Sequence, residues 1–422
     1  MSTLTITQAS CADDYDPNSM PVDKARAFIH QFLAPIEGVV RVPIRSALGR
    51  VLAEDVLSPV DVPSHRNSAM DGWAMRGADL KAEGETTLQE IGVSFAGKPF
   101  AGKVGPNQCV RIMTGGVVPE GADTVVMQER AKASGKSIAF APGQKTGQNV
   151  REAGEDLKAG SVALKAGRTV RPAELGLLAS LGVGEVSVRR RLRVAFFSTG
   201  DELKSIGTPL GEGEIYDSNR YTIYGMLERL GCEVLDLGVV RDDPALLERA
   251  FAEAARVADV VITSGGVSVG EADFVKSMLA RLGEVVFWKI AMKPGRPLAY
   301  GKIGGAHFFG LPGNPVSVMV TFYQFVRDAL LVLMGAHPVT PVPTFTATCT
   351  ARLKKAPGRT EFQRGVLTRG PNGALEVRPT GEQGSGILKS MSDANCFIIL
   401  GDATGNVEPG TAVEVQLLEG IV

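Results

Sequence analysis

The chain of 422 residues has few of the side chains that bind zinc or form disulfides. Its five cysteines are scattered and include no C-x-x-C pair, and its four histidines include no H-E-x-x-H motif. Structural and catalytic zinc sites depend on ligands at such spacings. We therefore expect buried free thiols, and neither a zinc centre nor a disulfide framework.

The sequence also lacks an excess of charge of either sign and lacks a long apolar run. It contains 45 Lys and Arg residues against 46 Asp and Glu residues, for a net charge of −1. This balance disfavours broad electrostatic binding to nucleic acid or to an anionic membrane. We find no run of 18 apolar residues and no signal-like apolar core in the first 20 residues. Residues 1–19 are expected to form a disordered tail. The sequence thus predicts no membrane span and a cytoplasmic protein.

What is present is typical of a soluble multidomain protein, with 44% hydrophobic and 22% charged residues. A helical apolar stripe lies between Pro21 and Pro35, and a second, shorter helix is expected over residues 44–52. Short alternating strands separated by Gly and Pro then indicate a small β domain. The pattern predicts four units, which are a linker domain made of residues 20–58 and 158–190, an inserted β domain (59–157), an α/β domain (191–338) and a C-terminal small β-barrel (339–422).

Strand and helix patterns alternate after Leu192, which indicates a doubly wound, mostly parallel α/β domain. The predicted strands cover residues 193–197, 233–237, 260–263, 285–290 and 307–311. The predicted helices cover residues 219–230, 244–257, 273–282 and 315–333. Ligands of such sheets bind outside the carboxyl ends of the strands, so the loops at those ends are the place to look for a site. The last 80 residues contain strand patterns only, and we expect no helix there.

One of these loops joins a buried strand to a glycine-rich turn and two acids. An apolar, β-branched run at residues 258–263 is followed directly by Ser264, Gly265 and Gly266. Glycine lets backbone N–H groups approach an anion closely, and the next helix adds the positive end of its dipole. The acids that follow, Glu271 and Asp273, would repel an anion unless a divalent cation lay between them. The stretch therefore predicts a combined phosphate and metal site.

Other charged or turn-forming residues follow neighbouring strands. They are Glu202, Asp242, the basic turn with Lys289, Lys293 and Arg296, and the Pro312 to Pro315 turn. Asp243 precedes a proline at a helix start and is expected to be its N-cap, which leaves Asp242 for the site. Several of these features have simpler readings that stay open. Asp273 could merely complement a helix dipole, Asp71 before Gly72 could form a turn, and Thr114 and Ser385 could belong to ordinary turns.

Eight motifs in the same order resemble one enzyme family. They are residues 67–74 (NSAMDGWA), 111–115 (RIMTG), 151–156 (REAGED), 198–203 (STGDEL), 216–219 (YDSN), 263–270 (TSGGVSVG), 293–297 (KPGRP) and 311–315 (LPGNP). The sequence is similar to molybdopterin molybdenumtransferases of the MoeA type, which include the gephyrin E domain. The resemblance runs from about Pro21 to the C-terminus, with Trp73 standing where a tyrosine is common in the family.

The resemblance implies a reaction and an assembly. Members insert molybdenum from molybdate into adenylylated molybdopterin and release AMP with the help of Mg²⁺. The family also implies a homodimer whose active site lies between the α/β domain of one subunit and the β domain of the other. Contact with the molybdopterin adenylyltransferase is expected as well. Nucleic acid and membranes are not expected partners.

The resemblance also implies roles for individual residues. Catalytic roles fall to Asp71, Thr114 and Asp156 on the β-domain side and to Glu202, Asp242, Asp273, Lys289 and Lys293 on the α/β side. Substrate-binding roles fall to Ser264, Gly265, Gly266, Arg296, Pro312, Pro315, Arg364 and Ser385, the last two near the molybdate route. Glu202, Asp242 and Asp273 are the expected Mg²⁺ ligands. Two other functions stay open at this point, a pterin adenylyltransferase sharing the α/β unit and a non-catalytic scaffold.

Overall fold

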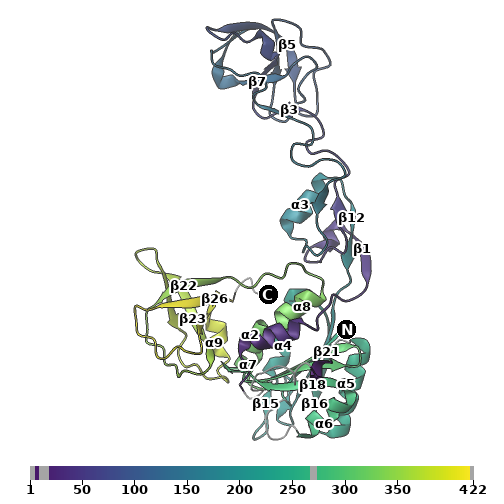
Figure 1. Cartoon of the computed structure of the whole chain (residues 1–422), viewed down its shortest axis with the longest axis vertical. Coiled ribbons are helices and arrows are strands. Elements are labelled where there is room, and N and C mark those ends of the chain that lie inside the picture. Colours follow the sequence, from purple (N-terminus) through teal and green to yellow (C-terminus); the bar gives the residue numbers. More distant parts are fainter. Residues whose placement is uncertain (1–4, 9–18, 267–272, 419–422) are drawn as a thin grey trace.

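The computed structural model describes residues 5–8, 19–266 and 273–418, without the side chains of Asp273 and Phe274. The molecule is elongated (Figure 1). A β domain occupies one end, a small linker domain lies in the middle, and the α/β domain and a C-terminal barrel lie side by side at the other end. The predicted fold class, a multidomain α/β protein with an inserted β domain and a small C-terminal barrel, is confirmed.

A six-stranded sheet forms the centre of the α/β domain, in the order β16-β13-β17-β21-β20-β18. The first four strands are parallel and the last two antiparallel. Their bounds are β16 (Glu233–Val240), β13 (Arg193–Thr199), β17 (Val260–Ser264), β21 (Ala306–Leu311), β20 (Pro297–Ile303) and β18 (Gly283–Lys289). Sequence analysis missed β20. The other five strands were predicted.

Helices cover both faces of this sheet because its central strands are apolar on both faces. Val194 and Phe196 of β13 pack against α4 (Ser218–Leu230), whereas Ala195 and Phe197 pack against α5 (Pro244–Val257) and α6 (Asp273–Leu282). The side chain of Asp243 accepts hydrogen bonds from the amides of Ala245 and Leu246, which confirms it as the N-cap of α5.

A long helix from Pro315 to Leu333 lies in the core next to α2 (Val22–His30). It consists of α7 (Pro315–Thr321), a π-helical turn (Phe322–Val326) and α8 (Arg327–Leu333). By length and composition alone this helix could cross a membrane. However, 67% of it is buried inside the protein, as in the core helix of a soluble protein.

The linker domain is built from two separate parts of the chain. β1 (Val39–Pro43) pairs with β12 (Glu185–Arg189), and β2 (Val56–Leu57) pairs with β11 (Val162–Leu164). α3 (Pro172–Ser180) covers them. The prediction of a helix over residues 44–52 was wrong. The helical part is a 3₁₀ turn at Ile44–Ala47, because Leu48 leaves the helical region with a ψ of 128° and Gly49 follows with a φ of 75°.

The inserted β domain contains a curled six-stranded sheet in the order β7-β4-β6-β5-β9-β8. Its strands are β4 (Gly72–Met75), β5 (Thr86–Ser94), β6 (Gln108–Ile112), β7 (Thr124–Met127), β8 (Ala131–Ser134) and β9 (Ser137–Phe140). A separate two-stranded ladder joins β3 (Asn67–Ser68) to β10 (Val150–Arg151), and 3₁₀ turns lie at Gly77–Asp79 and Gln128–Arg130.

The C-terminal barrel closes because β23 pairs with β25 as well as with β24. Its strands are β22 (Thr344–Cys349), β23 (Thr360–Arg369), β24 (Leu375–Pro379), β25 (Cys396–Leu400) and β26 (Ala412–Leu417). β19 (Met292–Lys293) of the preceding domain pairs with β23 and ties the two domains together. A short helix, α9 (Lys389–Asp393), corrects the expectation that this part of the chain contains strands alone.

Two smaller expectations concern the N-terminus and the cysteines. Ile6 is 3% exposed and its amide donates to Glu284, so this part of the N-terminal stretch packs on the core, although we expected a disordered tail. Cys109, Cys232, Cys349 and Cys396 are buried and free, as predicted for the described cysteines. Burial raises the pKa of the Cys109, Cys232 and Cys396 thiols to about 12, which keeps them protonated and unreactive.

Candidate functional site

A cavity of about 840 Å³ lies at the carboxyl ends of the parallel strands, where the sequence places a site. Loops after β13, β17 and β21 form its wall, together with the start of α4. β14 (Leu203–Lys204) and β15 (Ile215–Tyr216) form part of its rim. The cavity brings together seven of the predicted residues, which are Glu202, Asp242, Ser264, Gly265, Gly266, Pro312 and Pro315.

The glycine loop is held so tightly against β13 that side chains are excluded. Gly265 and Gly266 have φ angles of 91° and 69°, in the left-handed region. A Cβ atom on Gly265 would lie 2.6 Å from the carbonyl oxygen of Thr199, and one on Gly266 would lie 3.0 Å from the Thr199 hydroxyl. The Gly265 amide donates to the carbonyl of Leu311 at 3.1 Å. Glycine is therefore required here by the backbone, apart from any ligand.

Ser264 joins neighbouring loops through its hydroxyl. This group is buried, donates to the carbonyl of Pro312 at 3.3 Å and accepts from the side-chain amide of Asn219 at 2.8 Å. The same amide nitrogen donates to the carbonyl of Gly313 at 2.6 Å. These bonds fix the glycine loop against the Pro312 to Pro315 turn. Asn314 occupies the N-cap position of α7, but its side chain makes no capping hydrogen bond.

The acidic residues line the same cavity. Glu202 folds back on the chain, since a Cβ on Gly200 would meet its carboxylate at 2.4 Å. Asp242 lies on the loop after β16. Asp273 begins α6, and its side chain lies outside the described residues. Within the described part of the chain no three acidic, histidine or cysteine side chains gather as a metal site, so the predicted trio of Glu202, Asp242 and Asp273 stays a prediction.

The predicted basic residues lie beside the cavity, where β18 leads into β19 and β20. Lys289 pairs in the sheet with Pro297, which lines the cavity. The Arg296 carbonyl accepts from the Ile290 amide at 2.6 Å and closes the turn. The Lys293 Nζ lies 3.5 Å from the buried carboxylate of Glu361 in the barrel, and its side chain remains 49% exposed. The basic turn thus lies between the α/β domain and the barrel.

Arg364 and Ser385 belong to the barrel domain and are not among the described residues that line the cavity. Arg364 is 1% exposed, and its guanidinium donates to the Ser390 hydroxyl at 3.0 Å and to the carbonyl of Gly384 at 2.9 Å. Burial lowers its pKa to about 10. The carbonyl of Ser385 accepts from the Val316 amide at 3.1 Å, which holds the loop to the start of α7. Gly386, the next residue, lines the cavity.

The remaining three predicted residues lie in the β domain at the far end of the molecule (Figure 1). The Asp71 carboxylate accepts from the Thr114 amide at 2.7 Å and from its hydroxyl at 2.8 Å, and these bonds lower the pKa of Asp71. Beside them the Arg111 guanidinium stacks 4.3 Å from the ring centroid of Trp73. Asp156 lies apart from this pair, in a separate hollow with Arg151. The structure does not bring them to the cavity of their own chain.

Sequence analysis gave no role to several polar residues of the cavity wall, among them Thr199, Asp217 and Asn219. All three are more than nine-tenths buried, at 7%, 3% and 8% exposed. Two of them belong to the YDSN motif at residues 216–219, which was noticed as a motif and given no role. The missing signal was spatial, because the motif begins α4 directly beside the glycine loop.

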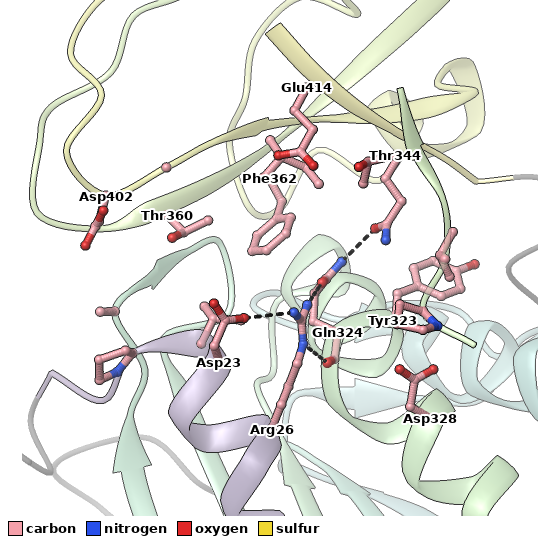
Figure 2. A pocket seen from close by; sticks show the side chains of 18 of the residues that line it. Asp23, Arg26, Tyr323, Gln324, Asp328, Thr344, Thr360, Phe362, Asp402 and Glu414 are labelled. Atoms are coloured by element: carbon pink, nitrogen blue, oxygen red, sulfur yellow. Dashed lines mark hydrogen bonds and ion pairs between the residues drawn. The ribbon is translucent and has the colours of Figure 1, made fainter. Parts of the chain in front are cut away.

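A second cavity, of about 920 Å³, separates α2 and the π-helical turn from the barrel, and Figure 2 shows its lining. None of the described residues that line it belongs to the predicted site. Arg26 lines this cavity, donates a hydrogen bond to the carbonyl of Gln324 at 2.9 Å and forms an ion pair with Asp23 at 3.2 Å. The Gln324 amide continues to Gln416 of β26 at 3.0 Å. This network joins α2, the core helix and the barrel.

Comparison with known proteins gives one consistent result along the chain. Three family profiles match in order, namely the MoeA N-terminal region (domains I and II) at residues 20–182, the probable molybdopterin binding domain at 195–331 and the MoeA C-terminal region (domain IV) at 346–418. The chain is 49% identical over 374 residues to a molybdopterin molybdenumtransferase of Haemophilus influenzae, covering 88% of this chain and 92% of that one. It is 35% identical to that of Bacillus subtilis, covering 94% of each.

The fold agrees with the sequence relatives. A crystal structure of a molybdopterin biosynthesis MoeA protein from Pyrococcus horikoshii OT3 matches with a TM-score of 0.81 and 29% identity, covering 95% of this chain and all of that one. The match therefore includes the linker domain, the inserted β domain, the α/β domain and the barrel. Profiles, relatives and fold agree over nearly the whole length, and the chain belongs to the molybdopterin molybdenumtransferase family.

Proposed function

We propose that this protein inserts molybdenum from molybdate into adenylylated molybdopterin and releases AMP in an Mg²⁺-dependent reaction. Its family makes it an enzyme of molybdenum cofactor biosynthesis. The observation that carries the proposal is the cavity at the sheet edge. There a glycine loop that can hold phosphate lies in one wall with the carboxylates of Glu202 and Asp242.

The acids fit a hard cation and would oppose a phosphate without one. Carboxylate oxygens are the ligands that Mg²⁺ prefers, and Mg²⁺ commonly takes one or two of them while it keeps several waters. We assign this role to Glu202 and Asp242, with Asp273 at the start of α6 as the third candidate. When bound, Mg²⁺ would neutralise charge on the phosphoanhydride oxygens, which lowers the barrier to breaking that bond.

The chain's own groups would position the phosphate and offset its charge. The amides around Gly265 and Gly266 can donate to phosphate oxygens, because glycine leaves the backbone uncovered. Ser264 and the Pro312 to Pro315 turn hold this loop in place. Lys289 and Lys293 would neutralise charge that develops as the bond breaks, and Arg296 would grip a phosphate with two N–H groups.

Molybdate is a substrate, and we assign its entry to the barrel side. Arg364 carries a buried guanidinium whose described hydrogen bonds go to neutral groups, so a tetrahedral dianion nearby would be well placed to offset its charge. The loop with Ser385 connects Arg364 to the cavity through Gly384 and Gly386. A hydroxyl and a guanidinium are both suitable donors for an oxyanion.

We also propose a homodimer that completes each active site with the β domain of the other subunit. Asp71, Thr114 and Asp156 lie far from the cavity of their own chain (Figure 1), so a catalytic role for them requires a second copy. The exposed apolar residues of the linker, including Val39, Leu48 and Leu57, are compatible with such an interface. We further propose a cytoplasmic location and contact with the molybdopterin adenylyltransferase that makes the substrate.

The proposal is tested by exchanging one carboxylate for its amide. We expect Asp242→Asn to lower the rate of Mg²⁺-dependent AMP release at least about 100-fold, because a neutral amide is a poor Mg²⁺ ligand. AMP release and molybdenum transfer are measured with adenylylated molybdopterin, molybdate and Mg²⁺. Asp243→Asn is the matched control, since asparagine still caps α5. Full activity of Asp242→Asn, or no activity of the unaltered protein, would contradict the proposal.

A further inference from the structure

The start of α4 and the end of β13 line the cavity and contain buried polar atoms without protein partners. Within the described residues, Oδ2 of Asp217, Oδ1 of Asn219 and the hydroxyl of Thr199 have no hydrogen-bond partner. All three side chains line the cavity and are more than nine-tenths buried. Buried polar atoms are nearly always paired in folded proteins, so such atoms in a cavity wall point to a bound group that supplies the partner.

The hydrogen bonds that these side chains do make define what the remaining atoms can do. Oδ1 of Asp217 accepts from the Arg220 amide at 3.1 Å, in the N-cap position of α4. The amide nitrogen of Asn219 donates to the Ser264 hydroxyl and to the Gly313 carbonyl, so its Oδ1 must be the acceptor. The wall therefore offers two acceptors in Asp217 and Asn219. The Thr199 hydroxyl can donate or accept.

Two acceptors from residues two positions apart at the start of one helix favour a ligand with adjacent N–H donors. The pyrimidine edge of a pterin presents a 2-amino group directly beside the N3–H, with a 4-oxo acceptor next to them. Adenine differs, because its amino group is flanked by ring nitrogens that are themselves acceptors. We infer that Asp217 and Asn219 bind the N–H edge of the pterin ring and that the Thr199 hydroxyl donates to its oxo group. This inference rests on the proposed function, which places both a pterin and an adenylate in the cavity.

The test uses Asp217→Asn and two small probes. Asparagine keeps the oxygen that caps α4 but replaces the carboxylate Oδ2 with an N–H donor, which would face the donors of the pterin. The probes are pterin-6-carboxylate and the corresponding lumazine, which carries an oxo group in place of the 2-amino group. Binding is measured by fluorescence with the intact protein, without Mg²⁺ and then with it. AMP is the third ligand, and Asp243→Asn, which caps α5 away from the cavity wall, is the matched control.

We expect the unaltered protein to bind the pterin at least about tenfold tighter than the lumazine, because a missing donor leaves buried acceptors unpaired. Asp217→Asn should weaken pterin binding by about the same factor and remove the preference, while AMP binding changes less than about twofold. Asp243→Asn should leave all three ligands unaffected.

Three results would overturn the inference. Unchanged pterin binding by Asp217→Asn would show that the pterin lies elsewhere, and a larger loss for AMP would assign this wall to the adenylate. A loss that appears only when Mg²⁺ is present would make Asp217 a metal ligand.

The proposed function is judged separately by AMP release. If the protein binds pterin selectively but inserts no molybdenum, the proposed function fails and this inference holds. If Asp217→Asn inserts molybdenum at the normal rate, this inference fails and the proposed function holds.

Discussion

Replacement of Arg364 by methionine separates a ligand-binding role from a structural one. The guanidinium is 1% exposed, and burial lowers its pKa from 12.5 to about 10. This lowering of the pKa corresponds to a penalty of roughly 3 kcal/mol on the charged form. Because the folded pKa lies below the unfolded one, the penalty applies at pH 7 and is relieved only as the pH rises above about 10.

The substitution removes this penalty together with the hydrogen bond to the Gly384 carbonyl, which still accepts from the Ile387 amide at 3.4 Å. A hydrogen bond from a charged group contributes about 1.5–3 kcal/mol, so the two effects nearly cancel. Ser390 keeps a partner, since its hydroxyl donates to the carbonyl of Ile387 at 2.6 Å. Methionine also fills most of the volume of the arginine stem. We therefore expect Arg364→Met to change the local free energy of unfolding by less than about 2 kcal/mol, while molybdenum insertion falls at least about 100-fold.

Amide hydrogen exchange of peptides from β23 and β25 measures the local stability, and insertion is measured at increasing molybdate concentration. Arg369→Met is the matched control, because it makes the same change at the exposed end of the same strand. The reasoning is refuted if Arg364→Met destabilises the barrel by more than about 3 kcal/mol, which would indicate a structural role. It is equally refuted if insertion is normal.

Two further predictions concern the linker and the assembly. Hydrogen bonds from Arg171 and Arg168 lower the pKa of the buried Glu174 to about 2, so its stabilisation of the linker is present above pH 4.5 and lost as the pH falls towards 2. Glu174→Gln should weaken the protection of α3 amides from hydrogen exchange at pH 7. In this variant the protection should also fall less as the pH is lowered, and an unchanged pH profile would argue against this ion pair. Asp71→Asn and Asp242→Asn should each be inactive alone, yet co-expressed chains should regain about a quarter of the activity, because half of the dimers then hold one intact site. No recovery in verified mixed dimers would contradict completion of the site by the second subunit.

Much of the α/β domain could be predicted because local and tertiary signals agree there. α5 lies at the predicted residues, since Asp243 caps it and Pro244 favours the first helical position. β20 was missed because its residues, 297–303, contain a proline and a glycine, and its pairing with β18 and β21 is what makes it a strand. α9 has five residues, too few for a periodic pattern.

The candidate site was predictable where a residue follows a parallel strand, because strand ends share one edge of the sheet. This rule placed Glu202, Asp242 and the glycine loop at the cavity. Asp217 and Asn219 escaped it, since they begin a helix that the sheet rule does not cover. The distance between Asp71 and the cavity also escaped it, because the length and direction of the linker depend on strand pairing between residues far apart in sequence.

The π-helical turn at Phe322–Val326 forms part of the lining of the second cavity (Figure 2). A π turn holds one residue more than the regular helix would, and each residue advances the helix by about 100°. Deletion of one residue there would restore regular winding and rotate the preceding turns relative to α8 by that angle. Arg26 would then lose the Gln324 carbonyl that it now binds, and the seam between the core helix and the barrel would have to repack. The shape of the second cavity therefore depends on the one additional residue in the π-helical turn.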